Sequence, residues 1–172
     1  IVDTSSLVIS SGGDVYFDGS VDSVSGEVNS LAVNTAFQVH FVGAIGAVDR
    51  LATLSTSMVG DTYLGGDVFL NGGDSQFGDN VVLTSDVSID EDGSGAVIFG
   101  DSVDGDVTSG GYALTVDTAS GETRFLKSVN ASGGLGSAIV ADNLALANTA
   151  SLSLEMNGTI EGVNQDAVFV NG

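Results

Sequence analysis

The acidic segment Asp90-Glu91-Asp92-Gly93-Ser94-Gly95 contains the residue types that come closest to a chemical site in this sequence. Hard cations such as Ca²⁺ take several oxygen ligands, and three consecutive acids at a glycine-rich turn supply some of them. The segment lacks the alternating acids and the distant Glu of an EF-hand loop. Asp90, Glu91 and Asp92 are therefore a candidate calcium site, with a solvated acidic turn as the simpler interpretation. Apart from calcium, the sequence suggests no cofactor.

Catalytic chemistry has little to work with. His40 is the single histidine, cysteine is absent, and alternation with Val39 and Phe41 places the His40 ring on an outer face. A polysaccharide-acting enzyme would use paired carboxylates, which are plentiful, but also aromatic platforms, and the chain has no Trp and three Tyr. We expect no catalytic residue and no enzyme, and we keep such a polysaccharide-acting enzyme as the less favoured alternative.

The charge of the chain restricts its partners. Twenty-three acids against three basic residues give a net charge of −20. Such a surface repels nucleic acid and anionic lipid, so neither is an expected partner. No run of 18 apolar residues occurs, so membrane insertion by a helix is not expected.

Period-two alternation of apolar and polar residues is the main structural signal. Asp14 to Val21 alternates in this way, with positions 15, 17 and 21 on one face. Twenty-five glycines and no proline favour tight turns between regular strands with complete backbone donors. Further strands with the same pattern are expected at 31–33, 81–83, 97–99 and 114–116. The sequence is therefore predicted to be all-β.

Two periods run through the chain. Gly13–Asp22 matches Gly95–Asp104 at an offset of 82, and Leu31–Ala36 matches Leu114–Ala119 at an offset of 83. These matches predict one domain, residues 1–172, made of two repeats of about 85 residues, at about 1–86 and 87–172. A shorter spacing of 24, 28, 30 and 26 residues separates five phenylalanines that we expect to stack in one core ladder: Phe17, Phe41, Phe69, Phe99 and Phe125.

A spacing of this length is typical of a β-solenoid, in which each coil completes the core of the next. We predict a right-handed parallel β-helix of about six to eight coils, with strands about 4.8 Å apart. An antiparallel β-sandwich is the alternative, because sandwiches also alternate and turn every 8–12 residues. With the sandwich goes a second functional hypothesis, a calcium-dependent adhesive module.

Segments such as Gly13-Asp14-Val15-Tyr16-Phe17-Asp18-Gly19-Ser20-Val21 and Tyr112-Ala113-Leu114-Thr115-Val116-Asp117-Thr118 resemble the degenerate repeats of large bacterial surface proteins. These are the β-strand-repeat and filamentous-haemagglutinin-like adhesins and the passenger domains of autotransporters. The resemblance implies a right-handed parallel β-helix, secretion to the cell surface, and adhesion or matrix formation without catalysis.

The expected function is accordingly that of a structural or adhesive repeat module of a cell-surface adhesin or extracellular filament. Strand-like sequence close to both ends of the chain, without a polar cap, suggests stacking on neighbouring repeats or self-association end to end. A host or matrix surface ligand is the other expected partner. The expected location is extracellular, at the cell surface.

Overall fold

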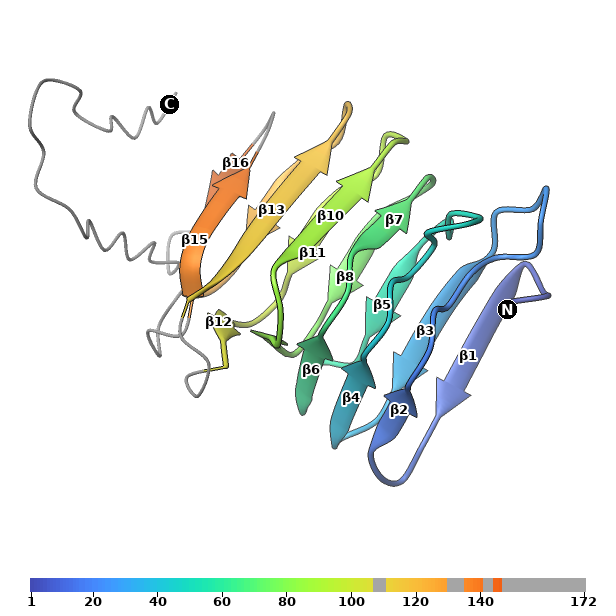
Figure 1. Cartoon of the computed structure of the whole chain (residues 1–172), viewed down its shortest axis with the longest axis horizontal. Helices are drawn as coiled ribbons and strands as arrows, with labels where there is room; N and C mark the ends of the chain where they lie inside the picture. The colour runs from blue at the N-terminus through green and yellow to red at the C-terminus, as the bar shows by residue number, and fades with distance from the viewer. Residues whose placement is uncertain (107–110, 130–134, 141–143, 147–172) are drawn as a thin grey trace, which may run out of the picture.

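The computed structural model describes residues 1–106, 111–129, 135–140 and 144–146, and this part of the chain consists of β-strands joined by turns (Figure 1). The all-β prediction is confirmed. Among these residues there is no helix of the length and hydropathy needed to cross a membrane.

The strands form three parallel sheets. The chain visits the sheets in rotation, so strands that are neighbours in a sheet are distant in sequence. The seven-stranded sheet contains β1 (Ser6–Ser10), β3 (Ser30–Asn34), β5 (Leu54–Thr56), β8 (Ser75–Phe77), β11 (Val97–Phe99), β14 (Thr123–Phe125) and β16 (Leu144–Leu146). The five-stranded sheet contains β2 (Val15–Phe17), β4 (Gln38–Phe41), β6 (Asp61–Leu64), β9 (Asn80–Leu83) and β12 (Val103–Gly105). The four-stranded sheet contains β7 (Val68–Leu70), β10 (Val87–Glu91), β13 (Tyr112–Thr118) and β15 (Leu135–Val140).

Every strand pairing in the described residues is parallel, as for β4 with β6 and for β10 with β13. The chain is therefore a β-solenoid, and the antiparallel sandwich is excluded. The strands complete about five turns instead of the expected six to eight. The expected number spread the coils over the whole sequence, whereas residues 147–172 lie outside the described part.

Alternation places one face of each strand in a continuous core. In β6, Thr62 and Leu64 are buried, whereas Asp61 and Tyr63 lie on the outer face. Leu64 pairs with Phe41 in the preceding coil and with Leu83 in the following coil, and all three are at most 1% exposed. Because burying one such side chain stabilises by about 1.5–3 kcal/mol, each coil depends on both of its neighbours for its stability.

Aspartates at the turns connect successive coils. The carboxylate of Asp14 accepts the backbone N–H of Gln38 at 3.1 Å, and the carboxylate of Asp74 accepts that of Ala96 at 2.9 Å. The same bond joins three further pairs, Asp22 with Val48, Asp67 with Ser88, and Asp86 with Ala113. These side chains satisfy amide groups beside the turns that the strand ladders leave without an acceptor.

The segments matched by the internal repeat do not occupy equivalent places in the coils. Phe17 lies in the five-stranded sheet, whereas its match Phe99 lies in the seven-stranded sheet. Leu31–Ala36 begins in β3 of the seven-stranded sheet, and its match Leu114–Ala119 belongs to β13 of the four-stranded sheet. The offset is therefore not a whole number of coils. A duplication dividing the chain at about residue 86 stays a prediction.

Candidate functional site

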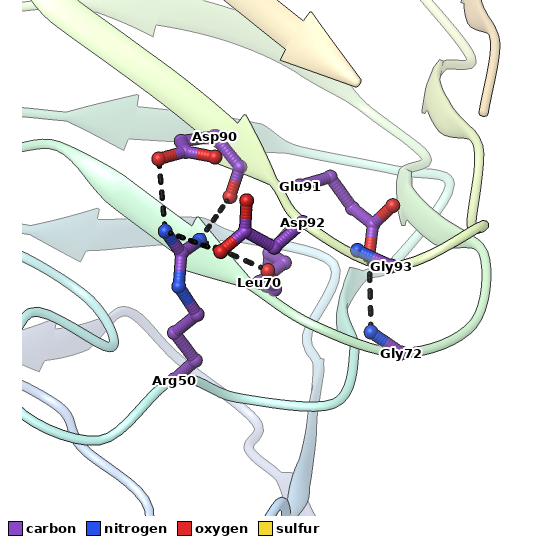
Figure 2. A network of polar contacts seen from close by, with 7 residues as sticks. All are labelled: Arg50, Leu70, Gly72, Asp90, Glu91, Asp92 and Gly93. Carbon is purple, nitrogen blue, oxygen red and sulfur yellow. Dashed lines mark hydrogen bonds and ion pairs between the residues drawn. The ribbon is translucent and has the colours of Figure 1, made fainter. Parts of the chain in front are cut away.

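The three acids of the predicted calcium loop do not face one point. Asp90 and Glu91 are the last two residues of β10, so alternation sends their side chains to opposite faces of the sheet. The side chains of Asp90 and Asp92 lie outside, beside Arg50, and Glu91 is fully buried (Figure 2). Among the described residues, no three His, Cys, Asp or Glu side chains are grouped to hold a metal ion. The loop is an ion-paired turn in this arrangement.

Arg50 braces three coils from the outside. One guanidinium nitrogen donates to the carbonyls of Leu70 at 3.1 Å and Asp90 at 3.0 Å. The other contacts the carboxylates of Asp90 at 2.9 Å and Asp92 at 3.1 Å. The guanidinium carbon also lies 5.4 Å from the ring centroid of Phe69. The hydrogen bond to Asp90 is the main cause that raises the pKa of Arg50 above its ordinary value, so the charge is fixed.

A local excursion of the chain brings Arg50 to this position. Ile45 pairs with Val68 and Leu51 pairs with Leu70, so five residues stand where the next coil has only Phe69. Gly46 begins the excursion with a φ of +70°, and a Cβ there would lie 2.2 Å from the carbonyl oxygen of Phe69. Only glycine fits this close approach. Sequence reasoning missed the brace, although a lone base among many acids was a signal for it.

Glu91 organises the inner side of the same corner. Its Oε1 accepts the backbone N–H groups of Gly72 and Gly93, both at 3.0 Å, and its Oε2 accepts that of Gly95 at 3.0 Å. A buried carboxylate is tolerated when backbone donors surround it in this way. Figure 2 shows that Glu91 reaches across from its own coil to Gly72 in the preceding one. Glu91 is therefore a structural residue that holds two glycine turns together.

The five phenylalanines do not form one ladder. Phe17 and Phe41 stack in the five-stranded sheet at 4.8 Å between centroids. Phe99 and Phe125 stack at 4.8 Å in the seven-stranded sheet, where Phe77, absent from the prediction, extends the stack at 5.4 Å. The prediction of a single column is wrong because coils differ in length, so equal spacing along the chain does not preserve position around the coil. The fifth residue, Phe69, lies on the outer face under Arg50.

A second buried acid lies at the corner between the seven- and five-stranded sheets. Asp79 is 1% exposed, and its Oδ1 accepts the hydroxyls of Thr56 and Thr62, both at 2.8 Å. Its Oδ2 has no partner. Burial raises the pKa of Asp79 above the ordinary value, and the two hydroxyl bonds partly oppose that shift.

An aromatic stack that sequence reasoning missed runs along the outer face of the five-stranded sheet. The His40 ring lies between Tyr16 and Tyr63, with centroids 4.3 and 4.4 Å away and planes within 6° of parallel. Gln38, on the same face, bonds to the His40 Nε2 atom at 3.1 Å and donates from its amide to the Tyr63 hydroxyl at 3.3 Å. The expected outward position of His40 is confirmed. The coil spacing of 23 or 24 residues between these three positions was the available signal.

No protein-family model matches the chain, and no curated protein or solved structure matches it. Function must therefore be argued from these residues. The buried acids hold turns together, and Arg50 braces coils. The outer face of the five-stranded sheet is different, because its ring edges, hydroxyls and amides lie at the surface. What this face offers is binding chemistry.

Proposed function

We propose that the chain is a non-enzymatic structural and adhesive repeat module of a bacterial cell-surface adhesin or extracellular filament. The supporting observation is the in-register stacking of the coils, in which core, aromatic stacks and turn hydrogen bonds all run along one axis. A force applied along that axis is shared by three parallel sheets. A stiff rod suits a module that holds a contact away from a cell.

The chemistry of the chain agrees with a surface role. A net charge of −20 keeps rods apart and soluble in an open medium. The resemblance of segments such as Gly13–Val21 to bacterial adhesin repeats implies secretion and a location at the cell surface. Self-association, or stacking on neighbouring repeats, belongs to the proposal because each sheet has edge strands such as β1 and β2.

The test combines shape, adhesion and turnover for the purified 172-residue chain. Electron microscopy and small-angle scattering should show elongated particles or end-to-end filaments. Beads coated with the chain should adhere to cell or matrix layers, and beads coated with the heat-unfolded chain should not. Compact particles without adhesion would contradict the proposal. Turnover on a panel of polysaccharides would replace it with the enzymatic alternative.

A further inference from the structure

Exposed apolar side chains gather beside the aromatic stack. Ten large hydrophobic side chains of the described residues are exposed, and half of them lie on or next to β2, β4 and β6. These five are Tyr16, Phe37, Val42, Met58 and Val59. The turns that carry Phe37 and Met58 are in contact, since a Cβ on Gly60 would lie 1.9 Å from the Phe37 carbonyl oxygen. Concentrated exposed apolar and aromatic surface marks an interaction site.

The charge around this surface has one sign. Asp14, Asp18 and Asp61 lie on the same face as the rings, and none of the five strands of the sheet contains Lys or Arg. The basic residues lie elsewhere and are paired. Arg50 lies over the four-stranded sheet, Arg124 on the seven-stranded sheet beside Glu122, and Lys127 beside Asp101. A partner must therefore bring the positive charge.

We propose that this docking face, the outer side of β2, β4 and β6 with Tyr16, His40 and Tyr63 at its centre, binds a basic protein segment rich in arginine. This inference deepens the proposed function and rests on it, because it names the adhesive face and the class of partner. Carboxylates attract the cations, and apolar side chains beside them contact the aliphatic stems.

The chain itself shows how it accommodates a guanidinium. Arg50 lies 5.4 Å from the Phe69 ring and pairs with Asp90 and Asp92. The docking face presents the same combination of aromatic ring and carboxylate with no internal arginine. Arginine should therefore bind better than lysine, because its planar group contacts rings and carboxylates together.

The test measures binding of octa-arginine, octa-lysine and octa-glutamate peptides and of neutral dextran to the whole chain by titration calorimetry. Octa-arginine should bind more tightly than octa-lysine, and octa-glutamate and dextran should not bind. Affinity should fall as NaCl rises from 0.1 to 1 M, since the screening length shortens from about 10 to about 3 Å. Dextran binding without peptide binding would overturn the proposal, as would equal affinity for the two cationic peptides.

Two charge-matched variants localise the site. Asp14→Asn with Asp61→Asn, and Asp74→Asn with Asp86→Asn, each change the net charge from −20 to −18 and keep a side-chain oxygen as acceptor. The first pair, on the docking face, should weaken octa-arginine binding about tenfold. The second pair, at turns away from it, should change binding less than about twofold. Equal losses would mean general attraction to an acidic protein and would overturn the inference.

Tyr63→Ala, which leaves the charge unchanged, should weaken octa-arginine binding about fivefold or more, and Tyr63→Phe should keep most of it. Circular dichroism melting confirms that each variant is folded. Rods that adhere to cells but fail to bind octa-arginine would refute the docking face alone. Compact, non-adhesive particles would instead refute the proposed function.

Discussion

Replacing Glu91 by leucine tests whether the buried carboxylate holds the glycine turns together. The change keeps a side chain of similar size and removes the acceptor of three backbone N–H groups. A buried donor without an acceptor costs about 1–3 kcal/mol. The bonds to Gly72 and Gly93 are partly buried and can exchange for water, whereas the bond to Gly95 is buried. We therefore expect a loss of about 3–5 kcal/mol in the free energy of unfolding.

Two further variants grade the effect. Glu91→Gln keeps one oxygen for Gly72 and Gly93 but turns an amide donor towards the Gly95 N–H, and should cost about 1–3 kcal/mol. Asp92→Asn is the matched control, since its side chain is 58% exposed and forms one ion pair at 3.1 Å with Arg50. It should cost less than about 1 kcal/mol.

Urea unfolding followed by far-UV circular dichroism at pH 7 measures these differences. Native-state hydrogen exchange adds a local reading, because the Gly72, Gly93 and Gly95 amides should lose protection in Glu91→Leu before the rest of the chain. A leucine variant within about 1 kcal/mol of the native chain, or uniform loss of protection, would refute the reasoning.

Three other changes follow from the same structure. Because burial raises the pKa of Asp79, its contribution to stability is fully present below the ordinary pKa of 3.8 and is lost as pH rises through the folded pKa. The stability of Asp79→Asn relative to the native chain should therefore increase over that range in urea titrations at stepped pH, and a constant difference would contradict this. Phe99→Ala, between two stacked rings, should cost about 3–5 kcal/mol by urea unfolding, and Phe17→Ala, half-buried in the first coil, clearly less. Gly95→Ala should lower the melting temperature strongly because its Cβ would lie 2.2 Å from the Gly73 carbonyl oxygen, whereas Gly12→Ala, in open space, should not.

The sequence was sufficient to predict the strands and their parallel stacking. Alternation around Val81–Leu83 and Val97–Phe99 depends on one buried face, and both segments are strands. What alternation does not fix is the number of residues between equivalent positions. Asp61 pairs with Asn80, 19 residues later, whereas Val87 pairs with Leu114, 27 residues later. Each change in turn length moves later side chains around the coil.

The candidate site was harder to predict for the same reason. The stack of Tyr16, His40 and Tyr63 requires two coils of nearly equal length, and nothing local in the sequence reports that equality. The excursion before Arg50 carries a long side chain over Phe69 to acids in a later coil. Contacts of this kind are set by the stacking of coils, which exists only once the chain has folded.

The acidity of the chain has two separable causes. Five turn aspartates bridge coils with Oδ1, as Asp14 does for Gln38, and a short side chain with an oxygen is what that bond requires. Asparagine would meet this requirement without charge, so the bond alone does not explain why all five are aspartate. Flat parallel sheets with exposed edges attract one another, and negative charge repels other copies of the chain. The turns therefore supply both cohesion between coils and repulsion between molecules. The docking face then stands out, because aromatic and apolar side chains stay exposed among the charges there.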